Sequence, residues 1–539
     1  MRRYRWDGDS LFLRRRRGLG VKGAVVVLLL TLWFLSLVSQ GFAGIVSWLA
    51  QGWASMSWVE RASSLIAGLG FILLFLGPAL RRSSGTSFLG FLGVALLILG
   101  LLAWGSAYAV TLNSNPSVIH VVRLTSPIDT ASSRLVPLHT AYAYAISMLQ
   151  TPTHTIYEAE TYVYYDLRGH IIYNWVVEPE GFWNSISRDP LGLVLVNGSV
   201  YPPQVVVVKQ DLHWGLHRYY LNPLYPDTLW REIKLRAGLG TWVMMDCNTE
   251  VVYRGVPYIL IPLATWRVGL TTTLPVPWGY AVVSPDGSIS IVDLKEAERS
   301  PLFRGVPIVP DVIAREWVEA YKYFTGIWNV MLYHNTYTIR DVGTNPQPYL
   351  MSDSSGHLYW VFIAEPPGAT YSAKYIFYVN ASDPNPHIMI YELPHPVLGI
   401  SKIASLIKQA HPTYDWGEFN VEEPMPIILN GTLYWKVTVI TKDGRGLVSI
   451  DMVDTQNNEV MSITPNKTVT MEAVVNYLLG AQPQQPETPN TTLGKVLQKI
   501  DQLKKQIALQ EKQLQELYKE LDSLEAMVRQ LAANATAKP

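Results

Sequence analysis

Three apolar runs constrain the fold of this chain more than any other feature. They cover residues 24–46, 62–80 and 87–110, and each is long enough to cross a hydrocarbon core of roughly 30 Å. We therefore expect a basic tail at 1–23, a three-span membrane anchor at 24–111, and a large remainder on one side of the membrane.

Basic residues near the spans predict the orientation, because short loops rich in Lys and Arg stay in the cytoplasm. Arg81 and Arg82 lie between the second and third spans, whereas the loop between the first two carries only Arg61, beside Glu60. The tail is strongly basic, with Arg2, Arg3, Arg5, Arg14, Arg15, Arg16, Arg17 and Lys22. The N-terminus is thus expected in the cytoplasm and the C-terminal part outside the cell. A cleaved signal peptide at the first run is the alternative, and it predicts the same outer placement.

The formal net charge is zero, but the charge is unevenly distributed. Residues 1–110 hold 11 Lys and Arg against 3 Asp and Glu, and residues 111–539 hold 32 against 40. The outer part is therefore mildly acidic, which excludes nucleic acid as its partner. Cys247 is the only cysteine, so no internal disulfide can form, and we favour buried packing for it. Candidate N-glycosylation sites, all outside the membrane region, are Asn197, Asn380, Asn430, Asn466, Asn490 and Asn534.

The outer part contains an internal repeat. Residues 162–181 read YVYYDLRGHIIYNWVVEPEG and residues 349–368 read YLMSDSSGHLYWVFIAEPPG. A looser third copy follows the turn Asn430-Gly431 and contains a second turn at Lys442-Asp443-Gly444, both typical of β-hairpins. At an offset of 187 positions, the first two copies share Tyr162/Tyr349, Asp166/Asp353, Gly169/Gly356, His170/His357, Glu178/Glu365, Pro179/Pro366 and Gly181/Gly368. Such agreement predicts duplicated units.

A helix is expected before each copy. Apolar residues recur at spacings of three and four over 133–149, 311–325 and 399–410, and Asp311 and Ser401 are candidate N-caps. Each unit is then a helix followed by an antiparallel meander, which predicts an α+β fold. We place the first outer modules at 112–300 and the later ones at 301–480.

The segment YWKVTVITKDGRGLVSIDMVDTQNNEV at 434–460 resembles PepSY-type modules, with MVDTQNNEV standing where the family usually closes on V-D-x-x-T-G-E. YVNASDPNPHIMIYE at 378–392 is similar to a second version of this ending. More broadly, 306–460 resembles the outer domains of prokaryotic membrane-anchored proteins. The resemblance implies restraint of a peptidase or another envelope role, and it carries over no functional residue.

No catalytic, cofactor-binding or metal constellation emerges from the motifs. His170 and His357, with the repeated Glu, would form a duplicated ligand site in one interpretation. The favoured alternative is a turn histidine retained from duplication. His213 and His217 have the spacing of zinc ligands, but Trp214 replaces the glutamate of a metalloprotease. The 18 Trp and 30 Tyr could line a carbohydrate groove, although buried cores are favoured.

A Pro- and Gln-rich linker at 481–492 leads into a predicted coiled coil at 493–533. Its a and d positions are Leu493, Val496, Ile500, Leu503, Ile507, Gln510, Leu514, Leu517, Leu521, Leu524, Val528 and Leu531, of which Gln510 alone is polar. A parallel homodimer would place Lys499 against Lys504 and Glu520 against Glu525, so an antiparallel pair or another chain is favoured. A single helix packed on its own outer part is the alternative.

These features predict a membrane-anchored cell-surface assembly or scaffold protein without enzymatic activity or cofactor. Its expected partners are the lipid bilayer and, through the coiled coil, a protein or a second copy of itself. Two alternatives stay open. One is a PepSY-like regulator of an envelope peptidase, and the other is a surface protein that binds or hydrolyses glycans.

Overall fold

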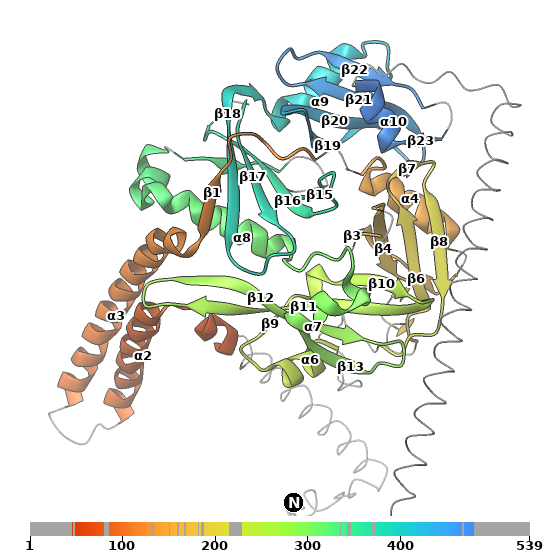
Figure 1. Ribbon diagram of the computed structural model, residues 1–539. Coiled ribbons are helices and arrows are strands. Elements are labelled where there is room, and N and C mark those ends of the chain that lie inside the picture. The colour runs from red at the N-terminus through yellow and green to blue at the C-terminus, as the bar shows by residue number, and fades with distance from the viewer. Residues whose placement is uncertain are drawn as a thin grey trace, which may run out of the picture. The chain divides into compact units, whose positions relative to one another are not determined.

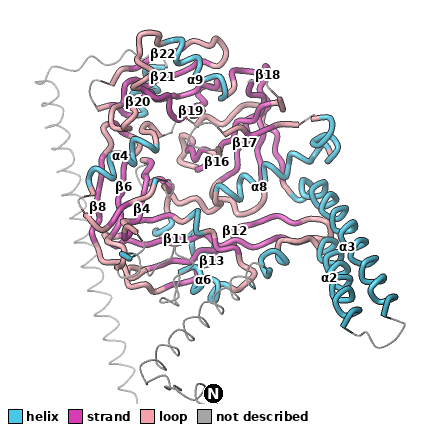
Figure 2. Tube along the Cα trace, turned by 180° about the vertical axis from the view of Figure 1, so that it is seen from behind, coloured by secondary structure: helices cyan, strands magenta, loops and turns pink. Residues whose placement is uncertain are grey.

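A computed structural model gives the fold in two compact units, residues 1–475 and 476–539. Nearly all of the residues that it describes belong to the first unit (Figures 1 and 2). They are 46, 49–79, 86–130, 134–149, 151–158, 161–166, 169–181, 183–184, 188–214, 229–334, 336–341, 347–368, 372–465 and 468–478.

Two apolar helices, α2 (Trp58–Ala79) and α3 (Thr86–Ser114), lie side by side as a hairpin (Figure 1). Glycine makes their close approach possible. A Cβ atom at Gly70 would lie 2.3 Å from the backbone nitrogen of Leu97, and one at Gly100 would lie 2.4 Å from that of Ala67. Since no side chain fits such gaps, the two backbones meet directly.

Among the described residues, the helical stretch Phe88–Val118 is the one that is long and apolar enough to cross a membrane. The sequence predicted three spans, so this part of the prediction is not met in full. The run at 24–46 lies outside the described residues except for Val46. The run at 62–80 lies within α2 as far as Ala79. The first turn of this helix is polar because it contains Glu60, whose carboxylate accepts hydrogen bonds from the backbone amide and the hydroxyl of Ser57.

The part outside the hairpin is mixed α and β, as predicted, and begins with a helix and a sheet. Helix α4 (Leu138–Met148) precedes a four-stranded sheet in the order β3-β4-β6-β8. Its strands are β3 (Tyr162–Tyr165), β4 (Ile171–Val176), β6 (Gly192–Asn197) and β8 (Gln204–Lys209). Two short pairs flank it, formed by β2 (His154–Thr155) with β5 (Glu178–Pro179) and by β7 (Val200–Tyr201) with β23 (Val469–Thr470).

A second helix-and-sheet unit follows. The sequence predicted outer modules within 112–300 but did not separate this unit from the first. Helix α6 (Leu229–Ala237) precedes an antiparallel sheet in the order β10-β11-β12-β13, to which β9 adds beside β11. These strands are β9 (Trp242–Val243), β10 (Thr249–Tyr253), β11 (Val256–Val268), β12 (Thr273–Val283) and β13 (Ile289–Asp293), and α7 (Leu294–Arg299) and η4 (Pro301–Phe303) come next.

The third and fourth units continue the pattern. Helix α8 (Asp311–Tyr321) precedes a sheet in the order β1-β18-β17-β16-β14, with β15 also paired to β16. Helix α9 (Ile400–Ala410) precedes the meander β19-β20-β21-β22, and α10 (Met471–Leu478) follows. The strands are β1 (His120–Arg123), β14 (Thr338–Ile339), β15 (Tyr349–Ser352), β16 (Leu358–Glu365), β17 (Ser372–Asn380), β18 (His387–Leu398), β19 (Phe419–Leu429), β20 (Thr432–Thr441), β21 (Leu447–Asp454) and β22 (Val460–Ile463).

Strand β1 comes directly after the α2–α3 hairpin but pairs in parallel with β18, with His120 opposite His387 and Arg123 opposite Ile390. The short 3-10 turn η1 (Asn115–Val118) joins α3 to this strand. The third sheet is therefore tied to the hairpin by an edge strand from a distant part of the sequence.

The three predicted helices are confirmed as α4, α8 and α9, but both predicted N-caps are wrong. Pro310 occupies the N-cap position of α8. The Asp311 carboxylate does not cap the helix and accepts a hydrogen bond from the Cys247 thiol. Gly399 caps α9 in an extended conformation, so Ser401 already lies inside the helix. In each case the chain enters the helix one or two residues earlier than the side-chain signal suggests.

Trp and Tyr residues fill the cores, as the favoured interpretation predicted. Trp175, Trp317 and Trp435 are fully buried. Trp317 on α8 packs between β11–β12 and β16–β18, and its indole donates to the Pro275 carbonyl at 2.8 Å. On the opposite face of the third sheet, α9 and the fourth sheet share another core. The third sheet is thus covered on both faces, and this joins the units.

Candidate functional site

The two repeated histidines lie in matching hairpin turns. In the first turn, Asp166 accepts a hydrogen bond from the His170 amide at 2.8 Å and contacts its Nδ1 at 3.2 Å. In the second, Asp353 accepts from the His357 amide at 2.9 Å and contacts its Nδ1 at 3.1 Å. Each aspartate thus holds its own histidine within the turn, which supports the structural interpretation.

The glycine before each histidine adopts a positive φ, 77° at Gly169 and 84° at Gly356. That conformation favours glycine and explains why both copies carry Gly-His. No group of three or more His, Cys, Asp or Glu side chains able to hold a metal lies within the described residues. Of the predicted zinc-spacing pair, His213 contacts Asp189 at 3.1 Å, and His217 lies outside the described residues.

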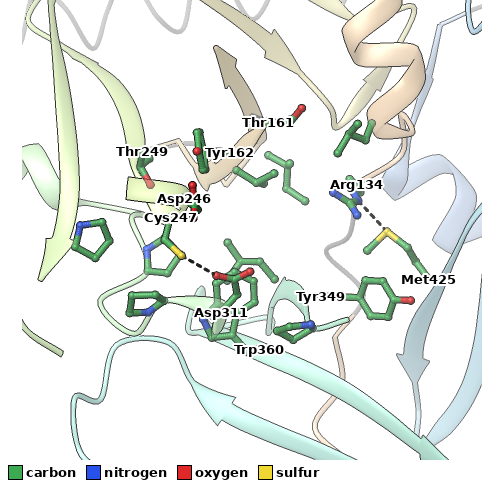
Figure 3. A pocket seen from close by; sticks show the side chains of 18 of the residues that line it. Arg134, Thr161, Tyr162, Asp246, Cys247, Thr249, Asp311, Tyr349, Trp360 and Met425 are labelled. Carbon is green, nitrogen blue, oxygen red and sulfur yellow. Dashed lines mark hydrogen bonds between the residues drawn. The ribbon is translucent and has the colours of Figure 1, made fainter. Parts of the chain in front are cut away.

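A cavity of ≈ 670 Å³ is lined by residues from all four units (Figure 3). Tyr162 comes from the first sheet, Cys247 from the turn before β10, Tyr349 and Trp360 from the third sheet and Met425 from β19. Figure 3 shows Cys247 beside Asp311 on one side of this cavity and Arg134 beside Met425 on the other. Its mixed lining would suit a small ligand with both apolar and polar groups.

The first pair is Cys247 and Asp311, whose Sγ and Oδ1 atoms lie 3.5 Å apart. Burial raises the pKa of the Cys247 thiol well above its ordinary value, and the nearby Asp311 carboxylate raises it further. Burial also raises the pKa of Asp311. A thiol held in its protonated form is a poor nucleophile.

The second pair is Arg134 and Glu423, an almost fully buried ion pair with an Nε–Oε2 distance of 3.1 Å. Arg134 also donates to the Met425 sulfur at 3.2 Å (Figure 3). Behind it, the fully buried Lys436 donates to the backbone carbonyls of Arg134 and Leu135 at 2.6 and 3.4 Å. The ion pair and the hydrogen bonds from Lys436 hold the loop before α4 against β19 and β20, so their role is structural.

Sequence reasoning missed this buried group of Arg134, Glu423 and Lys436. The available signal was the lone lysine in the apolar segment LYWKVTVI of β20. A charge in a strand buried on both faces needs partners, and the partners come from residues far away in the sequence. Such a pairing cannot be read from local spacing.

A second cavity of ≈ 720 Å³ lies beside α8, β17 and β18. Its lining is aromatic and mostly cationic, with Arg123, Lys322, Lys374, Tyr321, Phe324, Tyr337, Tyr375, Phe377 and Tyr391 among the residues, and it includes Glu392, which pairs with Lys374 at 3.4 Å. Tyr337 packs on Phe377 with ring centroids 4.6 Å apart, and Lys374 lies 4.9 Å from the Tyr375 ring centroid. Aromatic faces beside hydrogen-bonding cations are suited to sugars and to anionic ligands.

The remaining predicted sites fall in two groups. Asn430 is exposed in its hairpin turn, whereas Asn197 and Asn380 are half-buried at the ends of β6 and β17. Outside the described residues lie Asn466, Asn490, Asn534 and the whole coiled-coil seam from Leu493 to Leu531.

Comparison with known protein families, curated proteins and solved structures finds no match to this chain. The resemblance to PepSY modules therefore stays a prediction from the sequence.

Proposed function

We propose that this chain is a membrane-anchored surface protein that assembles or recruits partners and performs no catalysis. The observation that carries the proposal is the outer surface of the α2–α3 hairpin. Its exposed large side chains are overwhelmingly apolar and include Leu65, Leu69, Phe71, Ile72, Phe88, Phe91, Ile98, Leu99, Leu101 and Leu102. A continuous apolar surface of this kind is unfavourable in water and suits the interior of a bilayer, where helices satisfy their own backbone groups.

The orientation in this proposal follows from the flanking charges. The basic tail and the turn with Arg81 and Arg82 face the cytoplasm. The four helix-and-sheet units then lie outside the cell as a multi-pass protein's outer domain. With one cysteine in the chain, their stability comes from shared apolar cores.

Assembly is assigned to the predicted coiled coil at 493–533, since heptads with apolar a and d positions associate with another helix. The test is purification of the full chain from native membranes in mild detergent, beside a chain that ends at Ala481. Loss of a partner, or of self-association, on truncation supports the proposal. An unchanged set of partners refutes the role of the coiled coil and moves binding to the sheet units.

A surface glycan-binding function is the second candidate, because the aromatic and cationic cavity favours it. Tyr375 and Tyr391 line this cavity and are half-buried, so their rings can stack on a sugar. Saturable binding of an oligosaccharide that is lost in Tyr391→Ala would support this candidate. Val206→Ala on β8, an exposed position in another sheet, is the matched control.

A further inference from the structure

A group of exposed apolar side chains surrounds the end of the hairpin where α2 begins and α3 ends. We call it the apolar collar. Its members are 41–73% exposed and come from three segments of the chain: Leu49, Trp53, Trp58, Leu270, Phe324, Trp328, Met331, Leu332 and Tyr333. Other exposed apolar residues outside the hairpin are scattered, so this cluster calls for a partner.

The segment with the most exposed members is 324–333, which follows α8. It consists of η5 (Lys322–Thr325), a turn at Gly326 and the π-helical turn η6 (Asn329–Tyr333). The amide of Ile327 donates to the Asn113 side chain at 3.2 Å. Asn113 lies in the last turn of α3, so this hydrogen bond fixes the segment at the end of the membrane helix.

A second element reaches the same end of the hairpin from the β11–β12 turn. The amides of Trp58 and Val59, at the start of α2, donate to the carbonyls of Gly269 and Leu270 at 3.2 and 3.1 Å. Leu270 itself is 70% exposed. Two unrelated loops therefore attach to the helix ends by hydrogen bonds and both present apolar side chains to the outside.

The length of α3 places the collar at the height of the lipid headgroups. Starting at Phe88, a hydrocarbon core of about 30 Å takes about 20 residues at 1.5 Å each and ends near Tyr108. Asn113 then lies roughly 7 Å beyond the core, within the interfacial layer. Counted back from Ala79 at the other end of α2, the same length reaches Glu60, which puts Trp58 in this layer as well.

The chemistry of the collar fits that layer. Trp and Tyr prefer the membrane interface because their rings are apolar and their N–H or O–H groups are polar. Arg61 lies over the rings of both Trp58 and Trp53, 4.7 and 5.8 Å from the centroids. An arginine beside aromatic rings at a helix end is a typical interfacial anchor.

We infer that the apolar collar is a second membrane contact, inserted into the outer interface of the bilayer around the hairpin. It rests on the proposed membrane anchor and adds that the outer domain lies against the lipid surface. Segment 324–333 enters the interface with Trp328 and Leu332, and Leu270 enters from the β11–β12 turn. The domain is then held to the membrane at three places and not only by its helices.

The test uses the full chain with Cys247→Ser, reconstituted in phosphatidylcholine vesicles, with one new cysteine carrying an environment-sensitive fluorophore. The labelled variants are Leu332→Cys in the collar, Leu99→Cys on the exposed side of α3, and Asn457→Cys in an exposed turn after β21. Lipids that carry a doxyl group quench the fluorophore either near the headgroups or near the ends of the acyl chains, depending on where the doxyl group is attached. We expect strong shallow quenching at position 332, mainly deep quenching at position 99, and neither at position 457.

The outcomes separate the two proposals. Quenching at position 99 without quenching at position 332 overturns the collar and leaves the anchor standing. Absence of quenching at both positions overturns the anchor as well. Shielding of position 332 from a water-soluble quencher without quenching by doxyl lipids would assign the collar to a protein partner and also refute the inference.

Discussion

Lys436 offers a direct test of the buried charge group. Its side chain is fully buried on β20, and burial lowers its pKa from 10.5 to about 7, against the opposing effect of Glu423. At 1.36 kcal/mol per pKa unit, that shift disfavours the charged form in the folded protein by about 5 kcal/mol. The unfolded chain binds the proton readily, so the penalty is a loss of folding stability.

The sign of the pH dependence follows from this difference. Above pH 10.5 the lysine is neutral in both states and the penalty vanishes. As the pH falls from there to about 7, the unfolded state binds a proton that the folded state does not. The stability should therefore decrease by about 1.4 kcal/mol per pH unit within this window and stay constant below it.

Lys436→Met removes this titration. We subtract the unfolding free energy of the variant from that of the wild type. This difference should increase by about 1.4 kcal/mol for each pH unit as the pH rises from about 7.5 to about 9.5. Urea unfolding of the full chain in detergent, followed by circular dichroism, measures both. Taking the difference cancels other groups that titrate in this range. Lys295→Met, at an exposed position on α7, is the control and should keep the wild-type slope. Equal slopes in the wild type and Lys436→Met would refute the reasoning.

Three further changes test other parts of the structure. Gly100→Leu should lower the Tm in detergent by several degrees, because a Cβ would lie 2.4 Å from the α2 backbone, whereas Gly105→Leu, with open space around it, should not. Cys247 is half-buried, but the pKa of its thiol is raised, so maleimide should label it at least about tenfold more slowly than in urea-unfolded chain; equal rates would contradict the raised pKa. Arg340→Met removes the cation that lies 2.9 Å from the buried Glu365 carboxylate, and it should lower the unfolding free energy by about 3–5 kcal/mol. The double variant that also carries Glu365→Gln should regain part of this lost stability.

Local signals in the sequence predicted local structure well. The turn at Asn430-Gly431 has positive φ at both residues, 49° and 79°, as its hairpin signal requires. The repeated turns around His170 and His357 share their hydrogen bonds. A further likeness escaped the sequence comparison. The side chains of Asn197 and Asn380 each accept a hydrogen bond at 2.9 Å from the backbone amide two residues later, in Asn-Gly-Ser and Asn-Ala-Ser turns. The spacing between these two turns differs from the 187 positions that relate the two copies of the repeat.

The second sheet was the main element that the sequence did not define. Its long strands contain Pro257, Pro262, Pro275 and Pro277, and proline normally argues against a strand inside a sheet. The structure accommodates them in part through a register shift after Leu263. The ≈ 670 Å³ cavity and the buried Arg134–Glu423 ion pair were also missed, because their residues come together only when separate units pack.

The pairing of β1 with β18 has a consequence for how the chain folds. His120–Arg123 comes directly after α3, but its partner His387–Ile390 is made only after the first two helix-and-sheet units and most of the third. Until then this edge strand has open backbone groups, which is a state prone to wrong pairing. Closure of so long a loop is also slow. The third sheet is therefore expected to close late, when β18 docks onto this strand, and the α2–α3 hairpin would hold the strand in place meanwhile.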